Sequence, residues 1–171
     1  MCMFIPTYLV PRITDLDPQG LYDRGYRALL LDVDNTLTTH HNPAIPQDVR
    51  AWLDRAAAAG LTLVIVSNSK QFRTKPKAEM LGLPYVSLAC KPLPFGFLKA
   101  IKTTGLQKRD CLAIGDQTFT DVLGARIAGI AVVQTEPIQP ESGWSFRLRR
   151  RCEVGIRRRA KAILEKKERM L

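Results

Sequence analysis

The chain has 171 residues, of which 46% are hydrophobic and 25% charged, which permits one buried core and excludes collagen-like and wholly disordered classes. The formal net charge is +10, and residues 147–171 hold eleven Lys and Arg against three Glu. No window reaches the roughly 18–20 apolar residues that cross a bilayer, and Pro6 and Pro11 interrupt the apolar N-terminal stretch, which argues against a signal peptide. We expect a cytoplasmic protein with a near-neutral body and a basic tail.

Apolar runs alternate with helical patterns along the body of the chain. Strands are predicted at 28–31, 61–66, 85–88, 111–114 and 130–134, and helices at 46–59, 72–81, 95–103 and 121–128. Such a pattern predicts an α/β protein whose central parallel sheet, of about five strands, is covered on both faces. The Pro- and Glu-rich segment 135–143 predicts a linker. Residues 144–171 predict one or two basic helices that either pack on the body or extend from it.

The four cysteines are Cys2, Cys90, Cys111 and Cys152, and their spacing matches no metal-binding motif. We expect reduced thiols, with Cys90 and Cys111 buried in the core.

Residues capable of chemistry gather just after the predicted strands. They are Asp32, Asp34 and Thr36 after the first strand, Ser67, Asn68 and Ser69 after the second, Lys91 after the third, and Asp116 and Asp121 after the fourth. In a parallel sheet these positions share one edge, where ligands bind. Carboxylates without His or Cys favour a hard cation such as Mg²⁺, and the lysine and hydroxyls offer donors to an anion. With no Gly-rich nucleotide loop in the sequence, a carboxylate nucleophile that forms an aspartyl-phosphate fits best.

Four segments resemble, in order, the four motifs of the haloacid dehalogenase superfamily. They are LLLDVDNTL at 29–37, VIVSN at 64–68, Lys91-Pro92, and IGDQTFTD at 114–121. The resemblance runs over about residues 20–135. It implies a Rossmann-like three-layer sandwich around the parallel sheet.

The resemblance also implies a role for each matching residue near the phosphate. Asp32 would be the nucleophile, and Asp34 the general acid and then the general base. Lys91 would neutralise charge on the nucleophile and the phosphoryl group. Ser67 and Asn68 would bind the phosphoryl oxygens, Asn68 through its backbone.

The resemblance implies a Mg²⁺ site as well. Its ligands would be Asp32, the backbone carbonyl of Asp34, and Asp116, with Asp121 supporting the metal through water or by contacting its ligands. From the residues alone, Asp121 is equally well explained as the N-cap of a helix that starts at Val122.

The spacing of the motifs leaves no room for a cap domain. There are 30 residues between Thr36 and Ser67 and 23 between Ser67 and Lys91, enough for a helix and its loops. Among capless members, of subclass IIIA, the chain is most similar to the YqeG-type phosphatases and the related mitochondrial phosphatidylglycerophosphate phosphatases. We expect a phosphatase core over 1–140, with an N-terminal lead at 1–25, and a basic helical segment over 141–171.

The leading hypothesis is a Mg²⁺-dependent phosphomonoesterase that acts on phosphatidylglycerophosphate in phospholipid synthesis. The alternatives are the same chemistry on a soluble metabolite or a nucleic-acid phosphate end, and an RNA- or ribosome-associated binding module. The sequence does not indicate an oligomeric state. His40 and His41 are expected on an exposed loop.

The basic tail has three interpretations: a solvated helix, a peripheral contact with anionic membrane, or a nucleic-acid contact. For membrane contact, Phe4, Tyr8, Leu9 and Val10 could insert beside it. Because the motifs all precede Gln134, removal of the tail is expected to spare turnover of a small phosphate.

Overall fold

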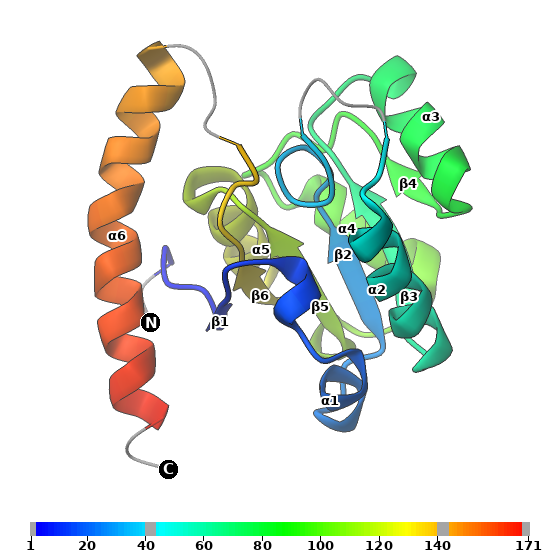
Figure 1. Cartoon of the computed structure of the whole chain (residues 1–171), viewed down its shortest axis with the longest axis horizontal. Coiled ribbons are helices and arrows are strands. Elements are labelled where there is room, and N and C mark those ends of the chain that lie inside the picture. Colours follow the sequence, from blue (N-terminus) through cyan, green and yellow to red (C-terminus); the bar gives the residue numbers. More distant parts are fainter. Residues whose placement is uncertain (1–2, 40–43, 140–143, 169–171) are drawn as a thin grey trace.

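A parallel sheet lies at the centre of the computed structural model, which describes residues 3–39, 44–139 and 144–168 (Figure 1). In this part of the chain the sheet has six strands in the order β1-β6-β5-β2-β3-β4, and each pairs with its neighbours in parallel. The strands are β1 (Tyr8–Leu9), β2 (Ala28–Leu31), β3 (Thr62–Val66), β4 (Tyr85–Val86), β5 (Cys111–Gly115) and β6 (Ala131–Gln134). The predicted fold is confirmed, with β1 added at one edge.

Helices cover both faces of the sheet because the central strands are apolar on both sides. Leu29 and Leu31 join the core cluster that includes Trp52, whereas Leu30 joins the cluster that includes Phe97. The first face carries α1 (Pro18–Asp23), α2 (Gln47–Ala58) and α3 (Gln71–Leu81), and the second carries α4 (Phe95–Thr104) and α5 (Leu123–Ala128). The result is the expected three-layer arrangement.

The order in which the strands are added to the sheet reverses at β2. From β2 the chain runs outward to β3 and β4, then returns to β5 on the other side of β2 and continues to β6. Leu31 is in register with Ile114, so the loops after β2 and β5 start side by side. In open parallel sheets this point of reversal is where ligands bind.

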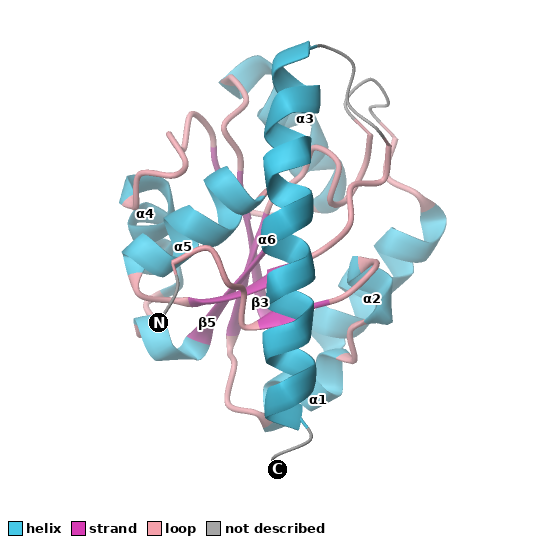
Figure 2. Cartoon of the chain, turned by 90° about the vertical axis from the view of Figure 1, so that its left-hand side faces the viewer, coloured by secondary structure: helices cyan, strands magenta, loops and turns pink. Residues whose placement is uncertain are grey.

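The basic tail forms one helix, α6 (Trp144–Glu168), which lies along the β1 side of the molecule (Figure 1 and Figure 2). Glu153 and Ala160 are buried against the body, whereas Ile163 is 44% exposed. Residues 135–139, which were predicted to be part of a linker, are tied to the body, since the amide of Thr135 donates to Gly115 and that of Ile138 to Asn35. The described part of the predicted linker therefore belongs to the body.

One expectation about apolar residues is wrong. Cys90 is exposed, although Cys111 is buried as predicted. Tyr8 and Val10, which could insert into a membrane in one interpretation of the tail, are partly buried against the core, and the ring of Phe4 lies 5.6 Å from that of Phe119. Within the described ranges, no helix combines the length and the apolar character that crossing a membrane requires.

Candidate active site

Asp32 lies at the carboxyl end of β2, at the point of reversal. Its amide donates to the carbonyl of Ile114 on β5 at 2.9 Å, which continues the pairing of the two strands by one residue. A tight turn follows, in which Asn35 adopts a φ of 67°, a left-handed conformation that Asn tolerates better than most residues. Asp32 and Asp34, two positions apart, both line the cavity at this edge, whereas Val33 between them is buried in the core.

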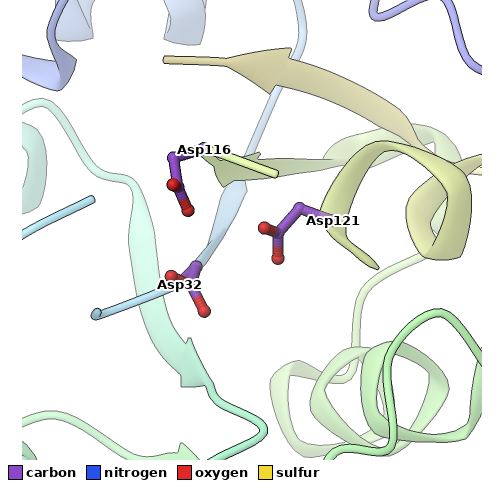
Figure 3. Close-up of side chains that lie close together, drawn as sticks. All are labelled: Asp32, Asp116 and Asp121. Atoms are coloured by element: carbon purple, nitrogen blue, oxygen red, sulfur yellow. The ribbon is translucent and has the colours of Figure 1, made fainter. Parts of the chain in front are cut away.

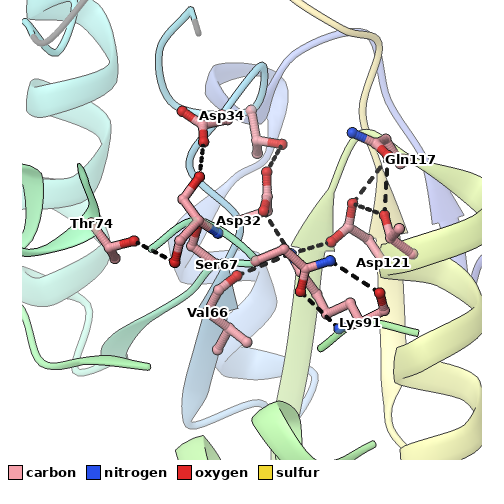
Figure 4. Close-up of polar contacts among 12 residues, drawn as sticks. Asp32, Asp34, Val66, Ser67, Thr74, Lys91, Gln117 and Asp121 are labelled. Carbon is pink, nitrogen blue, oxygen red and sulfur yellow. Dashed lines mark hydrogen bonds and ion pairs between the residues drawn. The ribbon is translucent and has the colours of Figure 1, made fainter. Parts of the chain in front are cut away.

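Lys91 joins three elements of the site (Figure 4). Its buried ammonium lies 2.6 Å from a carboxylate oxygen of Asp32 and 2.6 Å from one of Asp121, and it donates to the carbonyl of Val66 at 3.0 Å. The side chain of Asn68 holds the Lys91 backbone twice, accepting from its amide at 2.7 Å and donating to its carbonyl at 3.0 Å. This side-chain role of Asn68 was not predicted.

The electrostatics of this cluster follow from burial. Burial raises the pKa of Asp32 to about 7, opposed by the nearby Lys91 ammonium and reinforced by the Asp121 carboxylate. Burial alone would lower the pKa of Lys91, but the carboxylates of Asp121 and Asp32 more than offset it, and the pKa is raised. Lys91 is therefore a permanent cation, and further positive charge near Asp32 would favour the ionised form that a nucleophile requires.

Three carboxylates converge beside Lys91 (Figure 3). Asp32, Asp116 and Asp121 each offer an oxygen, and these atoms lie within 4.8 Å of one another. A set made only of carboxylate oxygens suits Mg²⁺ and fits poorly with softer metals. The Asp34 side chain is not part of this group, which leaves its backbone carbonyl for the predicted metal contact.

The loop after β5 brings Asp116 and Asp121 together. Asp121 lies within the π-helical turn Thr118–Val122, where its carboxylate accepts from the amide of Gln117 at 3.1 Å, so it is not the N-cap of the following helix. A Cβ atom on Gly115 would lie 2.4 Å from Cγ of Asp121. Glycine at this position therefore allows the close approach of the Asp121 carboxylate to the strand.

Asp34 has its own set of partners on the opposite side of the cavity. The Ser69 hydroxyl donates to one of its oxygens at 2.7 Å, and the Lys77 ammonium donates to the other at 2.7 Å. Arg73 lies 3.9 Å from the same carboxylate. Lys77, only 8% exposed, was missed by sequence reasoning, although its spacing of four from Arg73 places both on one face of α3.

A cavity of about 470 Å³ opens over these groups. Of the predicted site residues, it is lined by Asp32, Asp34, Ser67, Asn68, Lys91 and Asp121, and Asp116 is fully buried beside it. Its outer wall is formed by Lys70, Phe72 and Arg73 at the start of α3. The predicted site residues therefore lie together at one cavity. His40 and His41, which were expected on an exposed loop, lie outside the described residues.

The chain is similar to known phosphatases. The family model of haloacid dehalogenase-like hydrolases matches residues 44–129, and that of mitochondrial PGP phosphatases matches residues 1–82. The probable phosphatase YqeG of Bacillus subtilis is 33% identical over 153 residues, which are 90% of this chain and 89% of that protein.

Two further proteins are more distant. The chloroplastic/mitochondrial phosphatidylglycerophosphate phosphatase 1 of Arabidopsis thaliana is 26% identical over 91% of this chain, but the match spans only 47% of that protein. A crystal structure of an uncharacterized protein from Listeria monocytogenes serotype 4b has the same fold, with a TM-score of 0.56, 17% identity and coverage of 68% of this chain and 84% of that one.

Proposed function

Because the chain belongs to the haloacid dehalogenase-like hydrolases, as a homologue of the YqeG phosphatase, and is itself a phosphatase, we propose that it hydrolyses phosphatidylglycerophosphate through an aspartyl-phosphate on Asp32. The observation that carries the chemistry is the position of Asp32, beside a buried cation and at the floor of an open cavity. The substrate is inferred from the outer wall of that cavity.

The reaction has two steps. An oxygen of Asp32 attacks phosphorus, the bond from phosphorus to the leaving oxygen breaks, and Asp34 gives that oxygen a proton. Water then attacks the phosphorus of the aspartyl-phosphate and gives a proton to Asp34, which releases inorganic phosphate and restores both carboxyl groups. Lys91 offsets the negative charge of the phosphoryl oxygens, while the Ser67 hydroxyl is within the same cavity to donate to them.

Asp32, Asp116 and the backbone carbonyl of Asp34 would hold Mg²⁺, with Asp121 in support. The ion would neutralise phosphoryl oxygens and keep Asp32 ionised. Asp34 itself is held by Ser69 and Lys77, so its carboxyl group keeps one orientation while it exchanges a proton. These contacts support an assignment in which the nucleophile and the acid are separate carboxyl groups with separate partners.

The outer wall of the cavity favours a lipid substrate. Phe72 is 72% exposed at the rim, between the cations Lys70 and Arg73. An aromatic ring can enter the interfacial region of a bilayer while the cations attract anionic headgroups. The match to mitochondrial PGP phosphatases over residues 1–82 includes this segment.

The test compares one headgroup in two settings. Turnover is measured with Mg²⁺ on phosphatidylglycerophosphate in anionic vesicles and on glycerol 3-phosphate in solution. We expect a higher kcat/KM on vesicles. Phe72→Ser should lower the ratio of the two kcat/KM values about tenfold, as removal of an aromatic ring that partly enters the bilayer predicts. Met80→Ser, on the same helix at 47% exposure and away from the cavity, is the control. A kcat/KM on glycerol 3-phosphate equal to or higher than that on vesicles would contradict the lipid substrate and favour a soluble phosphomonoester.

The outward face of α6 supports peripheral membrane contact as a second feature. Arg158 and Arg159 are exposed there, and each cation near an anionic surface contributes about 1 kcal/mol. The double variant Arg158→Glu/Arg159→Glu should reduce co-sedimentation with anionic vesicles. Co-sedimentation equal to that of the wild type would remove this pair from the membrane contact.

A further inference from the structure

We infer that α6 belongs to the active-site scaffold, in which Glu153 and Arg157 are positioning residues that hold the loop 116–118 and, with it, the metal ligand Asp116. This inference rests on the proposed function, because it gives Asp116 the role of a metal ligand. The basic tail then has a positioning role in addition to its positive charge.

The contacts come from one face of the helix. Glu153 and Arg157 are four positions apart, so both point to the body of the protein. An oxygen of Glu153 accepts from the amide of Thr118 at 2.9 Å, and Glu153 is 1% exposed. Arg157 donates to the carbonyl of Asp116 at 3.0 Å and also to the carbonyl of Thr135. Side chains of the helix therefore bind main-chain atoms at both ends of the loop 116–118.

These main-chain groups lie just past the end of β5 at Gly115, where strand pairing stops. From the neighbouring strand β6, the side-chain Nε2 of Gln134 donates to the Asp116 carbonyl at 3.3 Å and to the Thr118 hydroxyl at 2.8 Å. The loop is thus fixed from two sides. The contacts from α6 involve charged groups, which form the stronger hydrogen bonds.

Packing alone does not account for these side chains. Burial of charged groups is costly, and apolar residues of similar size often stabilise a fold as well or better. Ala160 shows that α6 does use an apolar contact one turn further along. Arg157 and Glu153 instead bind polar atoms of the segment that carries Asp116. Outer partners of metal ligands typically change metal affinity 10–100-fold when they are lost.

The experiment measures Mg²⁺ binding by calorimetry on the metal-free full-length protein, together with kcat at saturating Mg²⁺ and Tm. Arg157→Ala should raise the Kd for Mg²⁺ about tenfold and leave kcat at saturating Mg²⁺ within about threefold of the wild type. Arg151→Ala, an exposed arginine on the same helix, should leave the Kd for Mg²⁺ and kcat unchanged. A purely structural role would lower Tm and the active fraction without changing the Kd.

Glu153 gives a second test that does not depend on Arg157. Glu153→Gln keeps an oxygen that accepts from the Thr118 amide and should bind Mg²⁺ nearly as the wild type does, whereas Glu153→Ala should bind more weakly. A Kd for Mg²⁺ that is unchanged in both Arg157→Ala and Glu153→Ala would overturn the inference and leave the proposed function intact. A wild-type protein that neither binds Mg²⁺ nor needs it for turnover would overturn the metal-dependent mechanism itself, and the inference with it.

Discussion

The strand edge and α6 both border the carboxylate group, but they make contact in different ways. At the strand edge, Lys91 joins Asp32 and Asp121 through side chains, at 2.6 Å each. From α6, Glu153 and Arg157 reach main-chain atoms of the loop 116–118. The contacts of Lys91 set the charge around the proposed nucleophile, whereas the contacts from α6 fix the position of the loop that carries Asp116. Substitutions in the first region should therefore lower turnover, and those in the second should weaken metal binding.

The strongest test of the strand edge is Asp32→Asn. An amide does not attack phosphorus at a useful rate, so kcat should fall more than about a thousandfold. The fold should persist, because burial already disfavours the charge on Asp32 and Lys91 keeps its contact with Asp121. Turnover of a soluble phosphomonoester and thermal unfolding measure the two effects. Turnover above a tenth of the wild-type value would remove Asp32 as the nucleophile.

Asp34→Asn should have the next largest effect on turnover. General acid catalysis is worth about 10²–10⁴-fold, and the loss should be greatest for alkyl phosphates, whose leaving group needs the proton. An aryl phosphate with an acidic leaving group serves as the matched comparison, and on it the loss should be smaller. Equal losses on the two esters would argue that Asp34 acts in some way other than as the acid.

Lys91→Met removes the charge at the same edge but keeps a side chain of similar length. It leaves Asp32 and Asp121 buried without their shared cation, which should cost about 3–5 kcal/mol of folding stability and lower kcat about a hundredfold. Unfolding in urea at pH 7 measures the first effect. Lys102→Met, on the exposed side of α4, should be neutral. A Lys91→Met protein as stable as the wild type would show that the ion pairs add no net stability.

Removal of residues 144–171 tests the other region. The motif positions alone predict that turnover of a small phosphate survives, whereas the contacts of Glu153 and Arg157 predict a loss of about tenfold at limiting Mg²⁺. Excess Mg²⁺ should restore part of that loss. If the truncated protein matched the full chain at every Mg²⁺ concentration, α6 would be an appendage and the contrast between the two regions would disappear.

The smallest effect is expected from labelling the thiols. Burial raises the pKa of Cys111 to about 11, so at pH 8 only about one thiol in a thousand is ionised, and Cys111 should resist alkylation. Cys152, exposed on α6 beside Glu153, should react readily and leave Mg²⁺ binding unchanged, because it points away from the body. Peptide mapping after iodoacetamide treatment checks both statements. Weaker Mg²⁺ binding after Cys152 is labelled would mean that the outer face of α6 also contributes to Mg²⁺ binding.

The sequence alone predicts the strand edge well, because the chemistry demands particular residue types at fixed positions. The proposed mechanism needs a carboxylate after β2 and a lysine after β4, so Asp32 and Lys91 stand out. Lys77 does not, since a lysine on a helix is ordinary and its partner Asp34 is 43 residues away. The two residues of β1 are too few for any periodicity to reveal.

The role of α6 could not be predicted for a different reason. Main-chain carbonyls and amides are the same in every residue, so a partner such as Arg157 leaves no complementary motif in the loop it holds. Within a segment of eleven cations, Arg157 cannot be distinguished by sequence from Arg158, although one is bound to the Asp116 carbonyl and the other is exposed. The fold, not the composition, separates the two.

The central claim is that Asp32 carries the phosphoryl group, and trapping that group tests it most directly. Protein quenched during turnover is reduced with borohydride, which converts an aspartyl-phosphate to homoserine, and the peptides are mapped by mass spectrometry. We predict homoserine at position 32, dependent on substrate and absent in Asp32→Asn. A phosphorylated residue elsewhere, such as Ser67, or turnover with no covalent intermediate under conditions that trap a known aspartyl-phosphate enzyme, would contradict the account.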